Sequence, residues 1–215
     1  EIIYVKVGKD DATDLAIVRQ VREAIGPDRR LRLDPNEHWG PLTAARMLPQ
    51  IAPYGIEFVE QPTDCESLSA LQQVRANSPI AIAVDQRVFT PYDAFDVCRA
   101  QAANLIVLGL HETGGITRFL KAGRIAEAAG INICAHGLYE TGITTCATHQ
   151  AAAVLPNLDD GNQYMNHFLE WDIIDSPALA LNAGKLALLG GPGLGFELNL
   201  DAVARASELH RKQET

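Results

Sequence analysis

The stretch IAIAVDQRVFTPYDAFDVCRAQAANLIVL, residues 80–108, gives the clearest indication of the fold. It opens with an apolar strand-like run, Ile80–Val84, and closes with another strand-like run, Asn104–Leu108, which is apolar from Leu105 onward. Between them, apolar residues in Tyr92–Ala102 recur at the spacing of a helix with one buried face. Two wholly apolar strands joined by a helix are typical of a parallel sheet that is covered on both faces.

The same unit repeats on both sides of this stretch. The other predicted strands are Ile2–Val7, Leu31–Leu33, Glu57–Val59, Ile131–Ala135 and Gln163–Phe168. The other predicted helices are Asp14–Ile25, Leu42–Ile51, Ser67–Ala76, Ile116–Ala129, Thr141–Leu155 and a final Leu200–Lys212. Because the units are evenly spaced, we predict an α/β fold of the TIM-barrel type over residues 1–175, with a C-terminal segment, residues 176–215, packed on it. Such barrels have eight strands, so we expect the chain to begin at the second.

The composition excludes several classes of function. Lysine and arginine number 18 against 27 aspartates and glutamates, for a formal net charge of −9. A chain this acidic lacks the basic face that nucleic-acid binding requires. No apolar run approaches the ~20 residues of a membrane span. The four cysteines, Cys65, Cys98, Cys134 and Cys146, form no C-x-x-C pair, which predicts reduced thiols in a cytoplasmic protein.

A carboxylate directly follows each of three successive strands. Asp34 follows LRL, Glu60 follows EFV and Asp85 follows AIAV. The carboxyl ends of barrel strands form one rim, where active sites lie. Carboxylates gathered there repel one another, and a divalent cation relieves the repulsion. Oxygen ligands favour Mg²⁺, or Mn²⁺, over zinc. The alternative is that each carboxylate caps the next helix or pairs with a neighbouring arginine, Arg46 or Arg87.

Two further residues at strand ends are candidates for proton transfer. Lys6 closes IIYVK and His136 closes INICAH, on opposite sides of the predicted rim. A lysine near a metal in a cleft can lose its proton near neutral pH and act as a base. A histidine there can serve as a second acid or base. The alternatives are a solvated or salt-bridged lysine and a hydrogen-bonded core histidine.

Eight segments, in order over nearly the whole chain, resemble the mandelate racemase/muconate lactonizing enzyme branch of the enolase superfamily. They are YVKVG, LRLDPNEHW, FVEQP, AVDQ, GGITRFLKAGRIAEAAGI, HGLYETGI, HFLEWDI and GPGLGFEL. The resemblance implies a (β/α)7β barrel that follows an N-terminal capping domain. We expect the cap and the first barrel strand to be absent from this chain. We also expect the C-terminal segment to pack on the cap as well as on the barrel. It implies one Mg²⁺ on Asp34, Glu60 and Asp85, and removal of the proton α to a carboxylate to give a metal-stabilised enediolate.

The resemblance also implies residue roles. Lys6 matches the second lysine of the family's K-x-K motif, which is the base, and His136 matches the histidine after the seventh strand in the mandelate racemase group. Glu170 matches the glutamate of that group that hydrogen-bonds the substrate carboxylate, and Asn36 matches the polar partner in D-x-N. Tyr4 replaces the first lysine of K-x-K. We expect Tyr4, Asn36 and Glu170 to bind substrate.

One departure concerns the partner of His136. Five residues before Gly114, the family carries either a second catalytic lysine or the aspartate that pairs with the histidine, whereas this chain has Gly109. The lysine pair of the muconate lactonizing group is therefore disfavoured. His111 and Glu112, two and three residues further on, are the nearby residues that could take the missing place.

These features predict a Mg²⁺-dependent isomerase or lyase, acting on a small hydroxy, sugar or amino acid by racemisation, epimerisation or dehydration. Three alternatives remain at this point: a muconate-type cycloisomerase, a Schiff-base lyase that uses Lys6, and a barrel that binds a carboxylate or a metal without turnover. The resemblance also implies a homo-oligomer, with a small carboxylate as the partner molecule.

Overall fold

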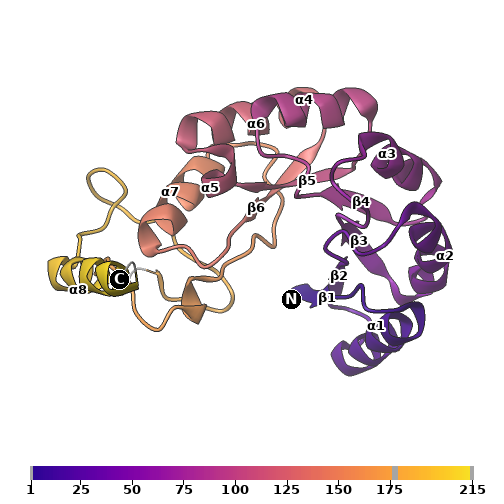
Figure 1. The fold of residues 1–215 in the computed structure, drawn as a ribbon, viewed down its shortest axis with the longest axis horizontal. Coiled ribbons are helices and arrows are strands. Elements are labelled where there is room, and N and C mark those ends of the chain that lie inside the picture. The colour runs from indigo at the N-terminus through magenta and orange to yellow at the C-terminus, as the bar shows by residue number, and fades with distance from the viewer. Residues whose placement is uncertain (1, 176–178, 214–215) are drawn as a thin grey trace.

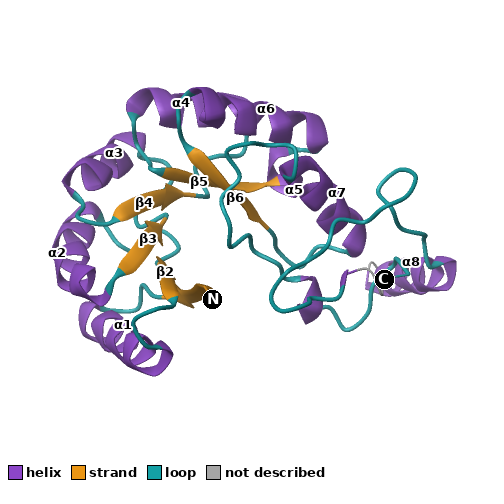
Figure 2. Ribbon diagram, turned by 180° about the vertical axis from the view of Figure 1, so that it is seen from behind, coloured by secondary structure: helices purple, strands orange, loops and turns teal. Residues whose placement is uncertain are grey.

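The computed structural model describes residues 2–175 and 179–213, and these contain one parallel sheet curled into a half-barrel (Figures 1 and 2). Its strands are β1 (Ile2–Lys6), β2 (Arg30–Asp34), β3 (Ile56–Glu60), β4 (Ala81–Val84), β5 (Leu105–Gly109) and β6 (Asn132–His136). Each strand pairs with the next one in sequence, which confirms the predicted α/β barrel topology. Residue 1 and residues 176–178, where the predicted C-terminal segment begins, lie outside the described residues.

Helices line the convex side of this sheet (Figure 1). They are α1 (Asp11–Ile25), α2 (Pro41–Ile51), the 3₁₀ turn η1 (Ala52–Tyr54), α3 (Leu68–Asn77), α4 (Pro91–Ala100), α5 (Leu110–Thr113), α6 (Ile116–Ala128) and α7 (Gly142–Ala152). The one-turn α5 was not predicted. The last helix, α8 (Leu200–Gln213), lies apart from this arc, beyond the segment that follows β6. Among the described residues, no helix is long and apolar enough to cross a bilayer.

Alternate residues of each strand face opposite sides of the sheet, and this alternation divides the interior in two. One set packs with the helices in the main core: Leu31, Leu33, Val59, Ile82, Val84, Ile106, Leu108 and Ile133. The other set forms a smaller cluster on the concave side: Phe58, Ala83, Leu105, Val107 and Cys134. The concave side is therefore a packed interior with its own side chains, as in a barrel.

A buried arginine ties the concave side to the segment after β6. Arg32 has no exposed surface and donates from Nε to Glu57 Oε2 at 2.7 Å. Its Nη1 donates to the carbonyl of Gly161 at 2.9 Å, and its guanidinium lies 4.6 Å from the centre of the Phe58 ring. Because a buried charge is costly unless it is paired, these contacts hold residues 160–161 against the sheet.

The predicted seventh strand, Gln163–Phe168, is wrong. This segment is irregular and ends in a 3₁₀ turn, η2 (Asn166–Phe168). The chain does run beside β6 from residue 157, but the ladder is interrupted: the Ala135 amide donates to the side chain of Asn162 at 2.7 Å instead of to a backbone carbonyl. Gly161, with φ of 73°, turns the backbone at the same point. A left-handed glycine followed by a side-chain acceptor breaks strand geometry, although the local residues suit a strand.

Candidate active site

The strand-end residues singled out from the sequence share one face of the sheet. Glu60, Asp85 and His136 each lie two residues after a member of the concave set. Lys6 and Asp34 lie two residues after Tyr4 and Arg32, which both contact Phe58 of that set. Alternation along the strands therefore turns all five to the concave side. Lys6 pairs in register with Asp34 on the neighbouring strand. Along the sheet the order is then Lys6, Asp34, Glu60, Asp85 and, after one strand, His136. The rim therefore presents three carboxylates between a lysine and a histidine.

Lys6 is held at the end of β1 by a small network. Its Nζ forms a hydrogen-bonded ion pair with the carboxylate of Asp34 and donates to Asn36 Oδ1 at 2.6 Å. The Asn36 amide in turn donates to Asp34 Oδ1 at 2.7 Å, and Asn36 has a left-handed φ of 46°. Asp34 is buried while the Lys6 side chain is 64% exposed. This network fixes the amine at the mouth of the half-barrel, where solvent and ligand can reach it.

Glu60 and Asp85 form a buried acidic pair. Burial raises the pKa of Glu60 well above its usual value, and the charge of Asp85 adds to the effect. Burial, followed by the charge of Asp34, raises the pKa of Asp85 to about 7. Glu60 Oε2 and Asp85 Oδ1 have no hydrogen-bond partner among the described residues. Donor atoms of Glu60, Asp85 and His136 lie within 4.8 Å of one another, a spacing that a metal ion can bridge.

Asp34 contacts Lys6 and Asn36 in this structure. In the part of the chain that the structure describes, it belongs to none of the three-residue sets whose donor atoms lie within 4.8 Å. Its carboxylate is already engaged by Lys6 and by the Asn36 amide. It still acts on Asp85 through its charge. A shared metal on Asp34, Glu60 and Asp85 thus stays a prediction.

His136 lies at the other end of the rim, beside Glu112 and His111. His136 Nδ1 is 4.0 Å from Asp85 Oδ1, and His136 Nε2 is 3.7 Å from Glu112 Oε1. The two imidazole rings stack, with their centres 5.9 Å apart. His111 Nδ1 is also 3.4 Å from Glu140 Oε1. Burial lowers the pKa of His136, and the charge of Glu112 opposes that effect.

Gly109 explains how Glu112 reaches this position. A Cβ atom at Gly109 would lie 2.4 Å from Glu112 Oε2 and 3.0 Å from Glu112 Cδ. The carboxylate of Glu112 therefore fills the space that a strand-end side chain on β5 would occupy. A glycine at the strand end and a glutamate three residues later were visible in the sequence, and the structure brings that glutamate to His136. The involvement of Glu140 was not predicted.

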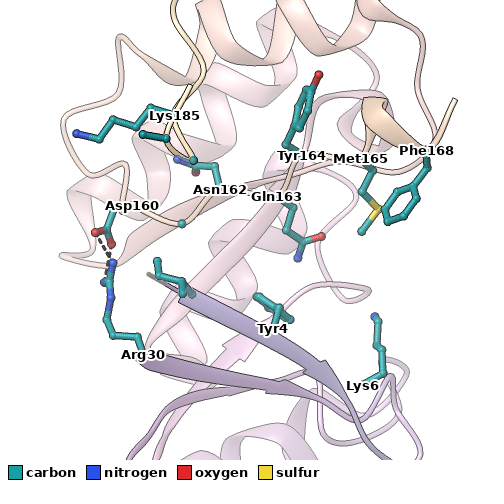
Figure 3. Close-up of a pocket in the computed structure, with 14 residues that line it drawn as sticks. Tyr4, Lys6, Arg30, Asp160, Asn162, Gln163, Tyr164, Met165, Phe168 and Lys185 are labelled. Carbon is teal, nitrogen blue, oxygen red and sulfur yellow. Dashed lines mark hydrogen bonds and ion pairs between the residues drawn. The ribbon is translucent and has the colours of Figure 1, made fainter. Parts of the chain in front are cut away.

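The largest cavity found, about 780 Å³, extends from Lys6 along the open side of the half-barrel (Figure 3). Tyr4 lines it, packs edge-on against Phe58 at 6.0 Å, and has a buried hydroxyl without a hydrogen-bond partner among the described residues. Gln163 and Met165, from the segment after β6, lie across from Tyr4. Glu170 is exposed and is not among the residues that line this cavity. Its predicted contact with substrate remains a prediction.

Comparison with known proteins agrees with this arrangement. Residues 1–202 match the protein family described as enolase C-terminal domain-like. Muconate cycloisomerase 1 of Rhodococcus opacus is 34% identical over 194 residues, which cover 90% of this chain and 52% of that protein. The L-Ala-D/L-Glu epimerase of Bacillus subtilis is 34% identical over 200 residues, which cover 91% of this chain and 54% of that protein. The chain thus spans about half the length of these relatives.

A solved structure extends the comparison to three dimensions. The dipeptide epimerase from Cytophaga hutchinsonii, complexed with Mg and the dipeptide D-Ala-L-Val, superimposes with a TM-score of 0.90 at 28% identity. The alignment covers 95% of this chain and 55% of that one. Because the family match also runs through all six strands of the half-barrel, the chain belongs to the mandelate racemase/muconate lactonizing enzyme branch of the enolase superfamily and corresponds to its C-terminal domain.

Proposed function

We propose that this chain carries the catalytic rim of an enzyme that removes the proton α to the carboxylate of a small acid. Delivery of a proton to the opposite face of the α-carbon then completes a racemisation or epimerisation. The observation that carries the proposal is the buried Glu60–Asp85 pair, placed on one concave rim between an exposed amine, Lys6, and a buried imidazole, His136. The relatives are isomerases, two of them epimerases by name.

The residues present fit a divalent cation of the Mg²⁺ type, with Mn²⁺ as a substitute. Glu60 and Asp85 offer buried, unpartnered carboxylate oxygens, and hard oxygen ligands suit these ions. We propose Asp34 as the third ligand, since its carboxylate can serve either the amine of Lys6 or a cation. When bound, the ion would supply positive charge that offsets the negative charge developing on the substrate carboxylate. The relative from Cytophaga hutchinsonii was solved with Mg.

Lys6 and His136 would move the protons. Lys6 Nζ, held by Asp34 and Asn36, would take the α-proton in its neutral form and leave a carbanion stabilised as an enediolate. His136, at the other end of the rim, would deliver a proton to the opposite face of the α-carbon, with Glu112 fixing the orientation of its ring. Delivery to a β-hydroxyl instead would give dehydration. Muconate-type cycloisomerisation is the second candidate, because one relative is a muconate cycloisomerase.

Exchange of the α-proton in D₂O tests this proposal directly. The full chain, with Mg²⁺, is incubated with both enantiomers of amino acids, hydroxy acids and Ala-containing dipeptides, and ¹H NMR follows loss of the α-proton signal. Lys6→Ala is expected to abolish exchange in one enantiomer of the active compound and His136→Ala in the other, since each group serves one face. Absence of exchange throughout the panel, with Mg²⁺ bound, would instead support a non-catalytic barrel.

Two further experiments test the Schiff-base lyase and the cycloisomerase. Borohydride with a keto acid would trap Lys6 covalently only if a Schiff base forms, and the proposal expects no adduct by mass spectrometry. Incubation with cis,cis-muconate would identify a cycloisomerase by loss of the diene absorbance. Sedimentation of the same samples measures whether the chain forms the homo-oligomer that we also propose.

A further inference from the structure

Two histidines at the rim present ring nitrogens that are buried and unpartnered. Neither ring nitrogen of His111 or of His136 has a hydrogen-bond partner among the described residues. The His136 side chain is only 8% exposed. Leaving a buried polar group without a partner costs free energy, so such a group calls for an explanation by a ligand or an ion.

The distances between these groups suit metal ligands better than hydrogen bonds. Glu112 Oε1 is 3.7 Å from His136 Nε2 and 3.8 Å from His111 Nε2. Hydrogen bonds between such atoms measure about 2.7–3.2 Å. Around a tetrahedral zinc ion, with bonds of about 2.1 Å, neighbouring ligand atoms lie about 3.4 Å apart. Donor atoms of all three residues lie within 4.8 Å of one another.

The backbone places these three side chains in a fixed relation. His111 and Glu112 lie on α5, which follows β5 directly, and the Thr113 hydroxyl donates to the Gly109 carbonyl at 2.9 Å to close that turn. Gly109 leaves the space that the Glu112 carboxylate fills. Outside the set, Glu140 Oε1 lies 3.4 Å from His111 Nδ1, the position of an outer carboxylate that orients a metal-binding imidazole.

We propose that His111, Glu112 and His136 form a second metal site, selective for a divalent transition metal of the zinc type. Two imidazoles and one carboxylate, with an open fourth position, are a zinc ligand set, whereas Glu60 and Asp85 offer oxygen alone. The site goes beyond the proposed proton transfer and opposes it, because a nitrogen of His136 that binds a metal cannot carry a proton. Zinc bound through Nε2 of His136 would therefore inhibit a reaction in which that nitrogen carries the proton.

Metal binding to the full chain tests the site without any substrate. Isothermal titration with Zn²⁺, in the presence and absence of excess Mg²⁺, is expected to show one site that Mg²⁺ does not fill. His111→Ala and Glu112→Gln are each expected to weaken Zn²⁺ binding at least about tenfold. Even the loss of a residue that only hydrogen-bonds to a metal ligand lowers metal affinity by about this factor or more. Asp34→Asn, a change on the oxygen side of the rim, is expected to leave Zn²⁺ affinity within about threefold.

The opposite pattern would overturn the proposal. If Zn²⁺ merely replaces Mg²⁺ on the carboxylates, Asp34→Asn will weaken it and His111→Ala will not. Circular dichroism checks that each variant is folded. A measurement on the unaltered chain stands independently of the variants: Co²⁺ is expected to show the intense visible absorption of a four-coordinate ion with imidazole ligands, and a weak octahedral spectrum would contradict the site. Because no substrate is used, failure here is distinct from failure of the proton-exchange test.

Discussion

Raising the pH from about 5 to about 8 is expected to destabilise the metal-free chain, and Mg²⁺ is expected to restore the lost stability. In the folded chain, burial and the charge of Asp34 raise the pKa of Asp85 from its usual 3.8 to about 7. Over that range the folded state binds more protons than the unfolded state, so the free energy of unfolding falls as the pH rises. At about pH 5 the unfolded carboxyl is already ionised while the folded one is protonated, so the two pH units up to the folded pKa of about 7 correspond to about 3 kcal/mol.

Thermal unfolding followed by circular dichroism measures this effect. For a chain of this size about 1 kcal/mol moves Tm by about 2–4 °C, so the loss of about 3 kcal/mol lowers Tm by about 6–12 °C. Saturating Mg²⁺ is expected to raise Tm strongly at about pH 8 and weakly at about pH 5, since metal binding requires deprotonated carboxylates. The matched control is Asp85→Asn, which keeps the shape of the side chain and cannot ionise. An equal effect of Mg²⁺ at both pH values, or an undiminished effect in Asp85→Asn, would refute the assignment of Asp85 as a metal ligand.

Three substitutions test other parts of the structure. Arg32→Met removes a fully buried guanidinium and leaves the Gly161 carbonyl without its donor, while Glu57 keeps Arg30 as a partner, and is expected to lower the free energy of unfolding in urea by about 1–3 kcal/mol. Gly109→Ala places a Cβ 2.4 Å from Glu112 Oε2 and is expected to lower the free energy of unfolding by about 1–3 kcal/mol. The double variant with Glu112→Ala is expected to recover most of that loss, and additive losses would contradict the contact. Asn162→Ala leaves the Ala135 amide without its acceptor and is expected to cost about 1–3 kcal/mol and to speed hydrogen exchange at that amide; unchanged exchange would show that the bond is dispensable.

The strands and most helices were predictable because their residues carry the pattern themselves. Ile80–Val84 and the LIVL part of Asn104–Leu108 are apolar on both faces. A strand needs this when one face packs against helices and the other against the barrel interior. The segment Gln163–Phe168 was predicted wrongly since its conformation depends on distant groups. Gly161 adopts its turn against Arg32, and Asn162 bonds to β6, and neither contact is visible in local sequence.

The site was predictable to the extent that the alternation of side chains along each strand determines which residues face the concave side. Lys6, Asp34, Glu60 and His136 are the last residues of their strands and Asp85 directly follows β4, so the alternation of side chains turns all five to one side of the sheet. Which of them touch is decided by side-chain conformation. Lys6 reaches Asp34 and Asn36, for example, while the donor atoms of Glu60 and Asp85 gather with those of His136.

Oxygen ligands and imidazole ligands lie at different ends of the rim. Oxygen donors come from β2, β3 and β4, while imidazoles come from α5 and β6, and the two sets meet where Asp85 Oδ1 lies 4.0 Å from His136 Nδ1. Cations held on both sides of so short a gap would repel each other, because burial limits screening. Mg²⁺ on the carboxylates would then weaken Zn²⁺ on the histidines, and by linkage Zn²⁺ would weaken Mg²⁺ by the same factor. Gly109 is central to this balance, because a Cβ at that position would lie 2.4 Å from Glu112 Oε2 and would displace the carboxylate that accompanies the two histidines.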